Sequence, residues 1–272
     1  MTPASASPRE PAVAGRFYPA EPDRLTAEVQ QLLGPIAEPE PALALIGPHA
    51  GYIYSGAIAG QTWARVKVPR RVVLMCPNHT GLGVARSLWS GGGWRLPGAT
   101  VPIDEALGSA LREHCEVTPD RDAHRREHAL EVHLPFALAR QPELRIAALC
   151  LGGLDLAACQ RMGEGLARVV KDSDEPVLLV ASTDMSHFES AEHAAKLDAL
   201  ALDRVRALDP LGLLTTVRDH DISMCGVVPT TVALFAANAL GAHEAQLVRY
   251  GHSGQVSGDD DRVVGYAGLL VR

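Results

Sequence analysis

The sequence lacks the features that mark membrane and nucleic-acid-binding proteins. It has no stretch of 18 or more residues that is apolar enough to cross a bilayer, and the best window, 146–159, is short and interrupted by Asp155. Acidic residues outnumber basic ones by 32 to 25, which gives a formal charge of −7, and no run dense in Lys and Arg occurs. We therefore expect no membrane partner and no nucleic-acid partner.

Cysteine is scarce, and its spacing excludes two further classes of protein. The five cysteines include no CxxC pair, so the sequence predicts neither a disulfide framework nor a zinc ribbon. Residues 1–11 contain no apolar segment after a positive one, which argues against a secretory signal. We expect a cytoplasmic protein.

Three common cofactor and catalytic signatures are also missing. No Gly-x-Gly-x-x-Gly opens a helix after a strand, and neither a P-loop nor a Gly-x-Ser-x-Gly elbow occurs. These absences argue against a dinucleotide-binding protein, a protein that binds nucleoside triphosphates and a serine hydrolase.

What the sequence does contain is a regular alternation of apolar runs and amphipathic segments. Short apolar runs bounded by Pro or Gly predict buried strands at 42–46, 71–76, 144–151, 176–181, 246–250 and 263–271. Helical periodicity predicts helices at 56–66, 104–114, 125–140, 156–170, 190–208 and 228–240. With no repeat and no linker, the chain is expected to form one α/β domain over residues 1–272. Its central sheet is expected to be largely parallel with helices on both faces, and the last two strands to pair antiparallel.

Polar side chains follow three of these predicted strands. His49 comes after the first strand, His79 after the second, and Asp184 and His187 after the fourth. A single histidine in such a place is most often an ordinary loop or core residue. Ligand sites of open α/β sheets gather at the carboxyl ends of the strands, so neighbouring parallel strands would bring these side chains into one crevice. The three motifs together predict a functional site.

Two histidines and one anionic ligand form a set that binds a transition metal and leaves positions open for a small molecule. The sequence offers two candidates for the anion. Asp184 is one of them. Cys225 is the other, because it precedes a predicted helix whose dipole would lower the pKa of the thiol; taken alone, this cysteine is more simply a packing residue.

The segment 126–133 resembles a zinc-peptidase helix only superficially. On the predicted helix, His128 and His133 are five residues and about 140° apart, so they cannot share one metal from one face. Glu127 and Glu131 lie one turn apart; we expect them on a solvated face, with a supporting role at the crevice as the alternative. His124 is expected on the surface.

A series of motifs in the chain resembles, in the same order, those of the Memo-like family. They span nearly the whole chain and comprise Gly15–Pro19, Pro48–Gly56, Pro77–His79, Glu127–Pro135, Ser182–His187, Met224–Gly226, Tyr250–Gly254 and Val264–Ala267.

The resemblance implies a fold and a set of site residues. The family is similar in fold to class III extradiol dioxygenases, three-layer α/β sandwiches that hold Fe(II) with two histidines and a carboxylate. His49 and His79 match the metal-binding histidines, and Cys225 stands where the dioxygenases have the carboxylate. His187 matches their acid/base histidine, with Asp184 beside it. Fe(II) is the metal that this resemblance favours, with copper as the alternative.

The resemblance also bears on partners. It implies a small molecule or a peptide in the metal crevice, and a functional association with radical-SAM and AMMECR-type proteins. The chain departs from many members at Phe17, where they have Trp, and at Cys76, where they have Gly. Animal members carry Arg and His where this chain has Val227 and Val228, so the peptide recognition described for them does not carry over.

Two functions remain open from the sequence. One is a metal-dependent redox enzyme in which His187 moves a proton. The other is a non-catalytic binding module that uses the same crevice to hold an anionic or phenolic group of a partner.

Overall fold

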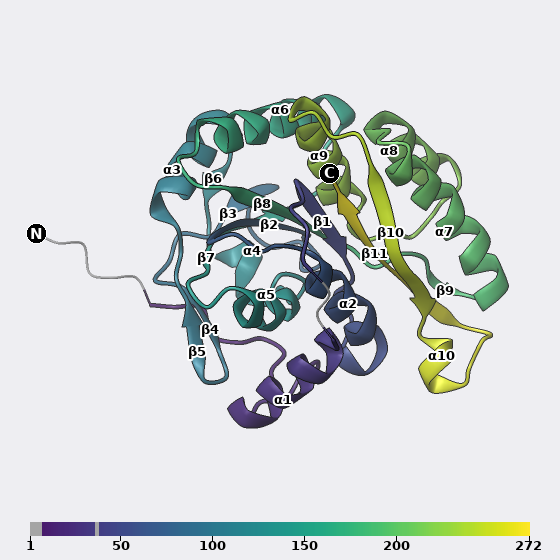
Figure 1. Ribbon diagram of the computed structural model, residues 1–272. Coiled ribbons are helices and arrows are strands. Elements are labelled where there is room, and N and C mark those ends of the chain that lie inside the picture. Colours follow the sequence, from purple (N-terminus) through teal and green to yellow (C-terminus); the bar gives the residue numbers. More distant parts are fainter. Residues whose placement is uncertain (1–6, 36–37) are drawn as a thin grey trace, which may run out of the picture.

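A mixed β-sheet runs through the centre of the computed structural model, which describes residues 7–35 and 38–272 (Figure 1). The strand order is β10-β11-β1-β8-β2-β7-β3-β6, and β9 pairs with β11 outside this path. The four central strands are parallel: β1 (Ala44–Gly47), β8 (Val177–Ser182), β2 (Arg71–Pro77) and β7 (Arg145–Leu151). Antiparallel pairing begins where β11 joins β1 and where β3 joins β7. The outer strands are β3 (Arg86–Leu88), β6 (Thr118–Pro119), β9 (His187–Glu189), β10 (Ala245–His252) and β11 (Val263–Val271).

Helices cover both faces of the sheet and complete a three-layer α/β sandwich. One face packs against α1 (Pro22–Leu33), α2 (Ala57–Arg65) and α5 (Leu134–Arg140). The other packs against α3 (Glu105–His114), α6 (Leu156–Asp172), α7 (Ala191–Arg206), α8 (Pro210–Asp219) and α9 (Val227–Ala239). The short elements are η1 (Tyr52–Gly56), the β4 (Trp94–Leu96) and β5 (Ala99–Val101) hairpin, α4 (Asp122–Arg125), η2 (Glu131–His133) and α10 (Gly254–Ser257).

The strands are where the apolar runs predict them. All six predicted strands form, with ends within two residues of the expected ones, and β10 and β11 pair antiparallel as expected. The central strands β1 and β8 are buried along their whole length, which explains their nearly continuous apolar sequence. The α/β prediction is confirmed.

The predicted helix over 125–140 is wrong. The chain leaves α4 at Arg125, passes through a turn and the single-turn η2, and starts α5 at Leu134. Pro135 occupies the first turn of α5, where its missing N–H costs nothing, whereas inside a continuous helix it would break the hydrogen bond to Glu131. The segment 126–133 is therefore free to turn toward the sheet edge.

The order of the central strands positions the site. The strand β8 lies between β1 and β2 in parallel register, with Ser182 beside Gly47. The loop that leaves β8 therefore emerges between those that leave β1 and β2. Among the described residues, no helix has the length and apolar character needed to cross a bilayer.

Close packing of α6 against α9 yields a test of the fold. A Cβ added at Gly163 in α6 would collide with Phe235 and lie 2.9 Å from the carbonyl oxygen of Val232, whereas one at Gly108 in α3 would only touch Leu88 at 3.8 Å. We expect Gly163→Ala to lower the free energy of unfolding by about 1–3 kcal/mol. The matched variant Gly108→Ala should raise it by about 0.5–1 kcal/mol, because alanine is the better helix former. Urea unfolding measures both, and a stabilised Gly163→Ala protein would contradict the packing.

Candidate metal centre

Four of the five predicted site residues follow β1, β2 and β8 at the same edge of the sheet. The rings of His49 and His79 lie with centroids 5.1 Å apart. Asp184 accepts a hydrogen bond from the backbone N–H of His49 at 2.8 Å, and its other oxygen lies 3.9 Å from His49 Nε2. The fifth residue, Cys225, reaches the same place from the loop before α9.

His49 presents one ring nitrogen to this space. Its side chain is buried, and its Nδ1 lies 2.7 Å from Ser182 Oγ, which leaves Nε2 facing the other site residues. Burial, followed by the nearby His128 and His79, lowers the pKa of His49 well below its usual value. At neutral pH the ring is uncharged, as a metal-binding imidazole must be.

His79 is held by a carboxylate. Glu127 accepts hydrogen bonds from the backbone N–H of His79 at 2.8 Å and from its Nδ1 at 2.9 Å. Burial lowers the pKa of His79, but the hydrogen bond and charge of Glu127 more than offset this and raise it overall. A carboxylate on the second ring nitrogen is the usual support of a metal-binding histidine, since it fixes the ring with Nε2 free.

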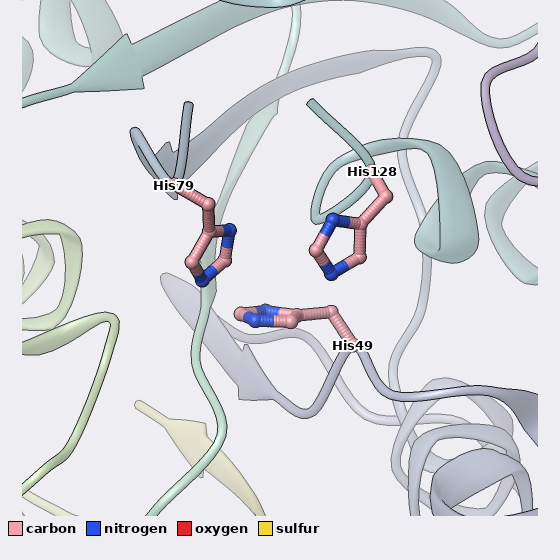
Figure 2. A group of neighbouring side chains, drawn as sticks. All are labelled: His49, His79 and His128. Carbon is pink, nitrogen blue, oxygen red and sulfur yellow. The ribbon is translucent and has the colours of Figure 1, made fainter. Parts of the chain in front are cut away.

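His128 lies beside these two histidines, although it is not among the site residues predicted from the sequence. One ring nitrogen each from His49, His79 and His128 lies within 4.8 Å of the others, and Figure 2 shows the three rings converging. The rings of His79 and His128 stack with centroids 5.0 Å apart. Burial lowers the pKa of His128. The predicted helix over 125–140 hid this residue; the helix-start signal of Pro135 indicates that the helix begins later, but not that His128 lies beside His49 and His79.

The two glutamates of this segment are buried, so the expected solvated face is wrong. The carboxylate of Glu127 accepts four N–H groups, those of His79 Nδ1 and of the backbone at His79, His128 and Ala129. Burial alone would raise the pKa of Glu127, but the His79 hydrogen bond and charge and the backbone N–H of Ala129 lower it to about 2.

Glu131 holds the N-terminal segment against the site. It pairs with the buried Arg9 and accepts hydrogen bonds from Tyr18 Oη at 2.6 Å and from the backbone N–H groups of residues 12 and 13. This anchoring places Phe17 edge-on against the ring of His128, with centroids 4.9 Å apart.

His124, expected on the surface, is buried near Trp89 and Trp94 instead. Burial lowers the pKa of His124 to about 4.

Cys225 lies next to one member of this cluster, His49, because its neighbour is glycine; its sulfur is not part of the group of three ring nitrogens that lie within 4.8 Å of one another. A Cβ at Gly226 would collide with the carbonyl oxygen of Ser182 and the side chain of Thr183, so only glycine lets this loop approach the end of β8. The Sγ of Cys225 lies 3.3 Å from His49 Nε2. Sulfur and nitrogen ligands of one tetrahedral ion lie about 3.5 Å apart, given bond lengths of about 2.3 and 2.0 Å.

The ionisation of Cys225 differs from the expectation. Instead of a lowered pKa, burial and the nearby Asp184 carboxylate raise the pKa of the thiol. A bound cation would reverse this, because a coordinating thiol loses its proton. Of the two candidate anions, Cys225 lies closer to His49 Nε2 than Asp184 does, and burial raises the pKa of Asp184 to about 6.

His187 lies at the rim, on β9. Its Nδ1 is 2.9 Å from the carbonyl oxygen of Ser223, which can only accept, so Nδ1 donates, and in the neutral ring Nε2 has the free lone pair. The ring is close enough to influence the pKa of both His49 and Asp184. His187 is not among the three histidines whose ring nitrogens lie within 4.8 Å of one another.

Comparisons with known proteins bear on the family and the fold. A family model described as Memo-like protein matches residues 9–270. A MEMO1 family protein of Methanopyrus kandleri is 39% identical over 279 residues, covering 97% of this chain and 99% of the relative. A MEMO1 family protein of Aquifex aeolicus is 39% identical over 267 residues, covering 96% and 98%. An uncharacterized protein of Escherichia coli K12 shares the fold, with a TM-score of 0.56 and 15% identity over 82% of this chain and 98% of that one.

The contact between Glu127 and His79 predicts a pH effect. In metal-free protein, Glu127→Gln should lower the pKa of His79, because only the smaller effect of the Asp184 charge then opposes that of burial. The raised pKa of wild-type His79 stabilises the fold below the ordinary value of 6.5, and that contribution is lost as the pH rises through the raised value. Wild type and variant should therefore differ more in free energy of unfolding at pH 5.5 than at pH 8.

Titration of the histidine rings by NMR measures this pKa, and chemical unfolding at the two pH values measures the stability. Glu189→Gln is the control, since Glu189 lies 3.9 Å from the exposed His193. An unchanged pKa of His79 in Glu127→Gln would show that the carboxylate does not control this ring.

Proposed function

The chain belongs to the Memo-like family, and on that premise we propose that it is a metal-dependent redox enzyme. We assign the metal ligands as His49, His79 and Cys225, with His128 as a fourth donor. Fe(II) is the proposed ion, and copper is the second candidate. The observation that carries the proposal is the approach of three imidazole nitrogens within 4.8 Å of one another, with a thiol sulfur 3.3 Å from one of them.

The donor set fits such an ion. Imidazole suits iron and copper, and a soft thiolate adds affinity for transition metals over magnesium or calcium, which prefer oxygen. The lowered pKa values of His49 and His128 keep these rings uncharged and able to bind. The hydrogen bond from His79 Nδ1 to Glu127 holds the third ring in place.

When bound, the ion supplies one-electron redox chemistry at a position open to a small molecule. The chain's own residues supply the proton transfer. His187 accepts a proton from the substrate at Nε2, because the carbonyl of Ser223 holds the proton at Nδ1. Asp184 holds the His49 loop through the backbone N–H of His49 and lies beside Cys225, whose Sγ accepts from the backbone N–H of Asp184 at 3.2 Å.

Metal content tests the ligand set. Wild-type protein purified without oxygen and reconstituted with Fe(II) should hold nearly one metal ion per chain. His49→Ala, His79→Ala and Cys225→Ala should lose it, and His128→Ala should bind it more weakly, because each removes a donor. Elemental analysis measures the content. The control Cys159→Ala removes a buried thiol outside the site and should keep the metal. No metal in reconstituted wild type would refute the proposal.

Oxygen uptake tests the role of His187. With ascorbate as the electron donor, the iron-loaded wild type should consume oxygen, and His187→Ala should retain the metal while losing at least about 100-fold in rate. His193→Ala, a change at an exposed histidine, is the control. Loss of metal from His187→Ala would place His187 among the ligands instead. The binding module would be favoured by two results together. The metal-loaded wild type would consume no oxygen, and it would bind a phenol saturably while a variant with His49 replaced would not.

A further inference from the structure

A chain of buried polar side chains lies behind His49. The three side chains, Ser182, His133 and Trp63, are all fully buried. Ser182 Oγ lies 2.7 Å from His49 Nδ1 and 2.9 Å from His133 Nε2, and Trp63 Nε1 lies 3.2 Å from His133 Nδ1. We call these three residues the Ser182 chain. Its hydrogen atoms can be placed one after another.

The assignment begins at Trp63, whose indole N–H can only donate. It donates to His133 Nδ1, so this nitrogen carries no proton. A neutral imidazole with a bare Nδ1 has its proton at Nε2. Burial also lowers the pKa of His133 to about 4, in agreement with a neutral ring. The Nε2–H of His133 therefore donates to Ser182 Oγ.

The serine hydroxyl completes the assignment. It has one hydrogen to give and two lone pairs that accept. The carbonyl oxygen of Ala129, 2.8 Å away, can only accept, so it takes the hydroxyl hydrogen. His133 occupies one lone pair, and the remaining one faces His49 Nδ1. This nitrogen must therefore carry the proton of the His49 ring.

We propose that the Ser182 chain fixes His49 as the Nδ1–H tautomer, with the lone pair of Nε2 directed at the metal site. Ser182 and His133 are positioning residues in this sense, since they act through His49. The contact between His49 Nε2 and Cys225 agrees with this tautomer, because the protonated thiol can donate to a bare Nε2. The tautomer itself follows from the hydrogen bonds alone, while its consequence for metal binding rests on the proposed function.

Without Ser182, the proton of His49 is free to occupy either nitrogen. A proton on Nε2 must leave before this atom can bind a metal ion. Supporting hydrogen bonds of this kind typically change metal affinity by about 10- to 100-fold when they are removed. Ser182 therefore controls the affinity of the site from a position that does not touch the ion.

The wild-type protein gives the first test. In metal-free protein labelled with ¹⁵N-histidine, long-range ¹H–¹⁵N correlation spectra distinguish protonated from bare ring nitrogens. The ring signals are assigned by their loss in His49→Ala and His133→Gln. We expect a protonated Nδ1 in His49 and a protonated Nε2 in His133. A proton on His49 Nε2, or on His133 Nδ1, would overturn the inference whether or not the protein binds metal.

A variant gives the second test. Ser182→Ala should show mixed protonation of the two His49 nitrogens and about 10- to 100-fold weaker Fe(II) binding than wild type. Ser87→Ala is the matched control, because Ser87 is an equally buried serine that donates to the carbonyl of Asp120. It should leave both readouts unchanged. Unaltered His49 tautomer and affinity in Ser182→Ala would refute the inference.

These experiments can refute the proposed metal function and the proposed role of Ser182 independently of each other. If His49 has the expected tautomer but wild-type protein binds no Fe(II), the Ser182 chain stands and the metal function falls. If wild type binds Fe(II) but His49 carries its proton on Nε2, the metal function stands and the role of Ser182 falls.

Discussion

The insertion of β8 between β1 and β2 is the constraint on which the site depends. Because the three strands are parallel and in register, the loops that follow them must emerge side by side at one edge. His49 and Asp184 meet there across 135 residues of sequence, through a hydrogen bond of 2.8 Å. Ser182, the last residue of β8, then lies directly behind His49. Strand order thus positions both the candidate ligands and the groups that orient them.

Much of this arrangement of strands and site residues can be predicted from the sequence. Strands buried on both faces need continuous apolar runs, so the central strands are conspicuous in the sequence. The polar motifs after β1, β2 and β8 predict a common site, and the meeting of His49, His79 and Asp184 agrees with it. The helices α1 and α8 are missing from the sequence prediction, although each begins with a proline in its first turn, which is a helix-start signal.

The segment 125–140 shows why the rest could not be predicted. Its periodicity favours a helix, but its two carboxylates are satisfied by distant partners that no local pattern reveals. Glu131 is paired with Arg9, more than a hundred residues away, and Glu127 with His79. These contacts offset the free-energy cost of burying the two carboxylates. They also hold the chain in a turn that places His128 beside His49 and His79. Tertiary hydrogen bonding, absent from any local window, therefore decided this part of the site.

The central claim is that imidazole nitrogens and the sulfur of Cys225 share one metal ion. X-ray absorption spectroscopy at the iron edge of reconstituted protein tests it most directly. The account predicts one sulfur neighbour at about 2.3 Å together with nitrogen neighbours at about 2.0–2.1 Å, and the loss of the sulfur contribution on substitution of Cys225 by serine. A wild-type spectrum with only nitrogen and oxygen neighbours would contradict it.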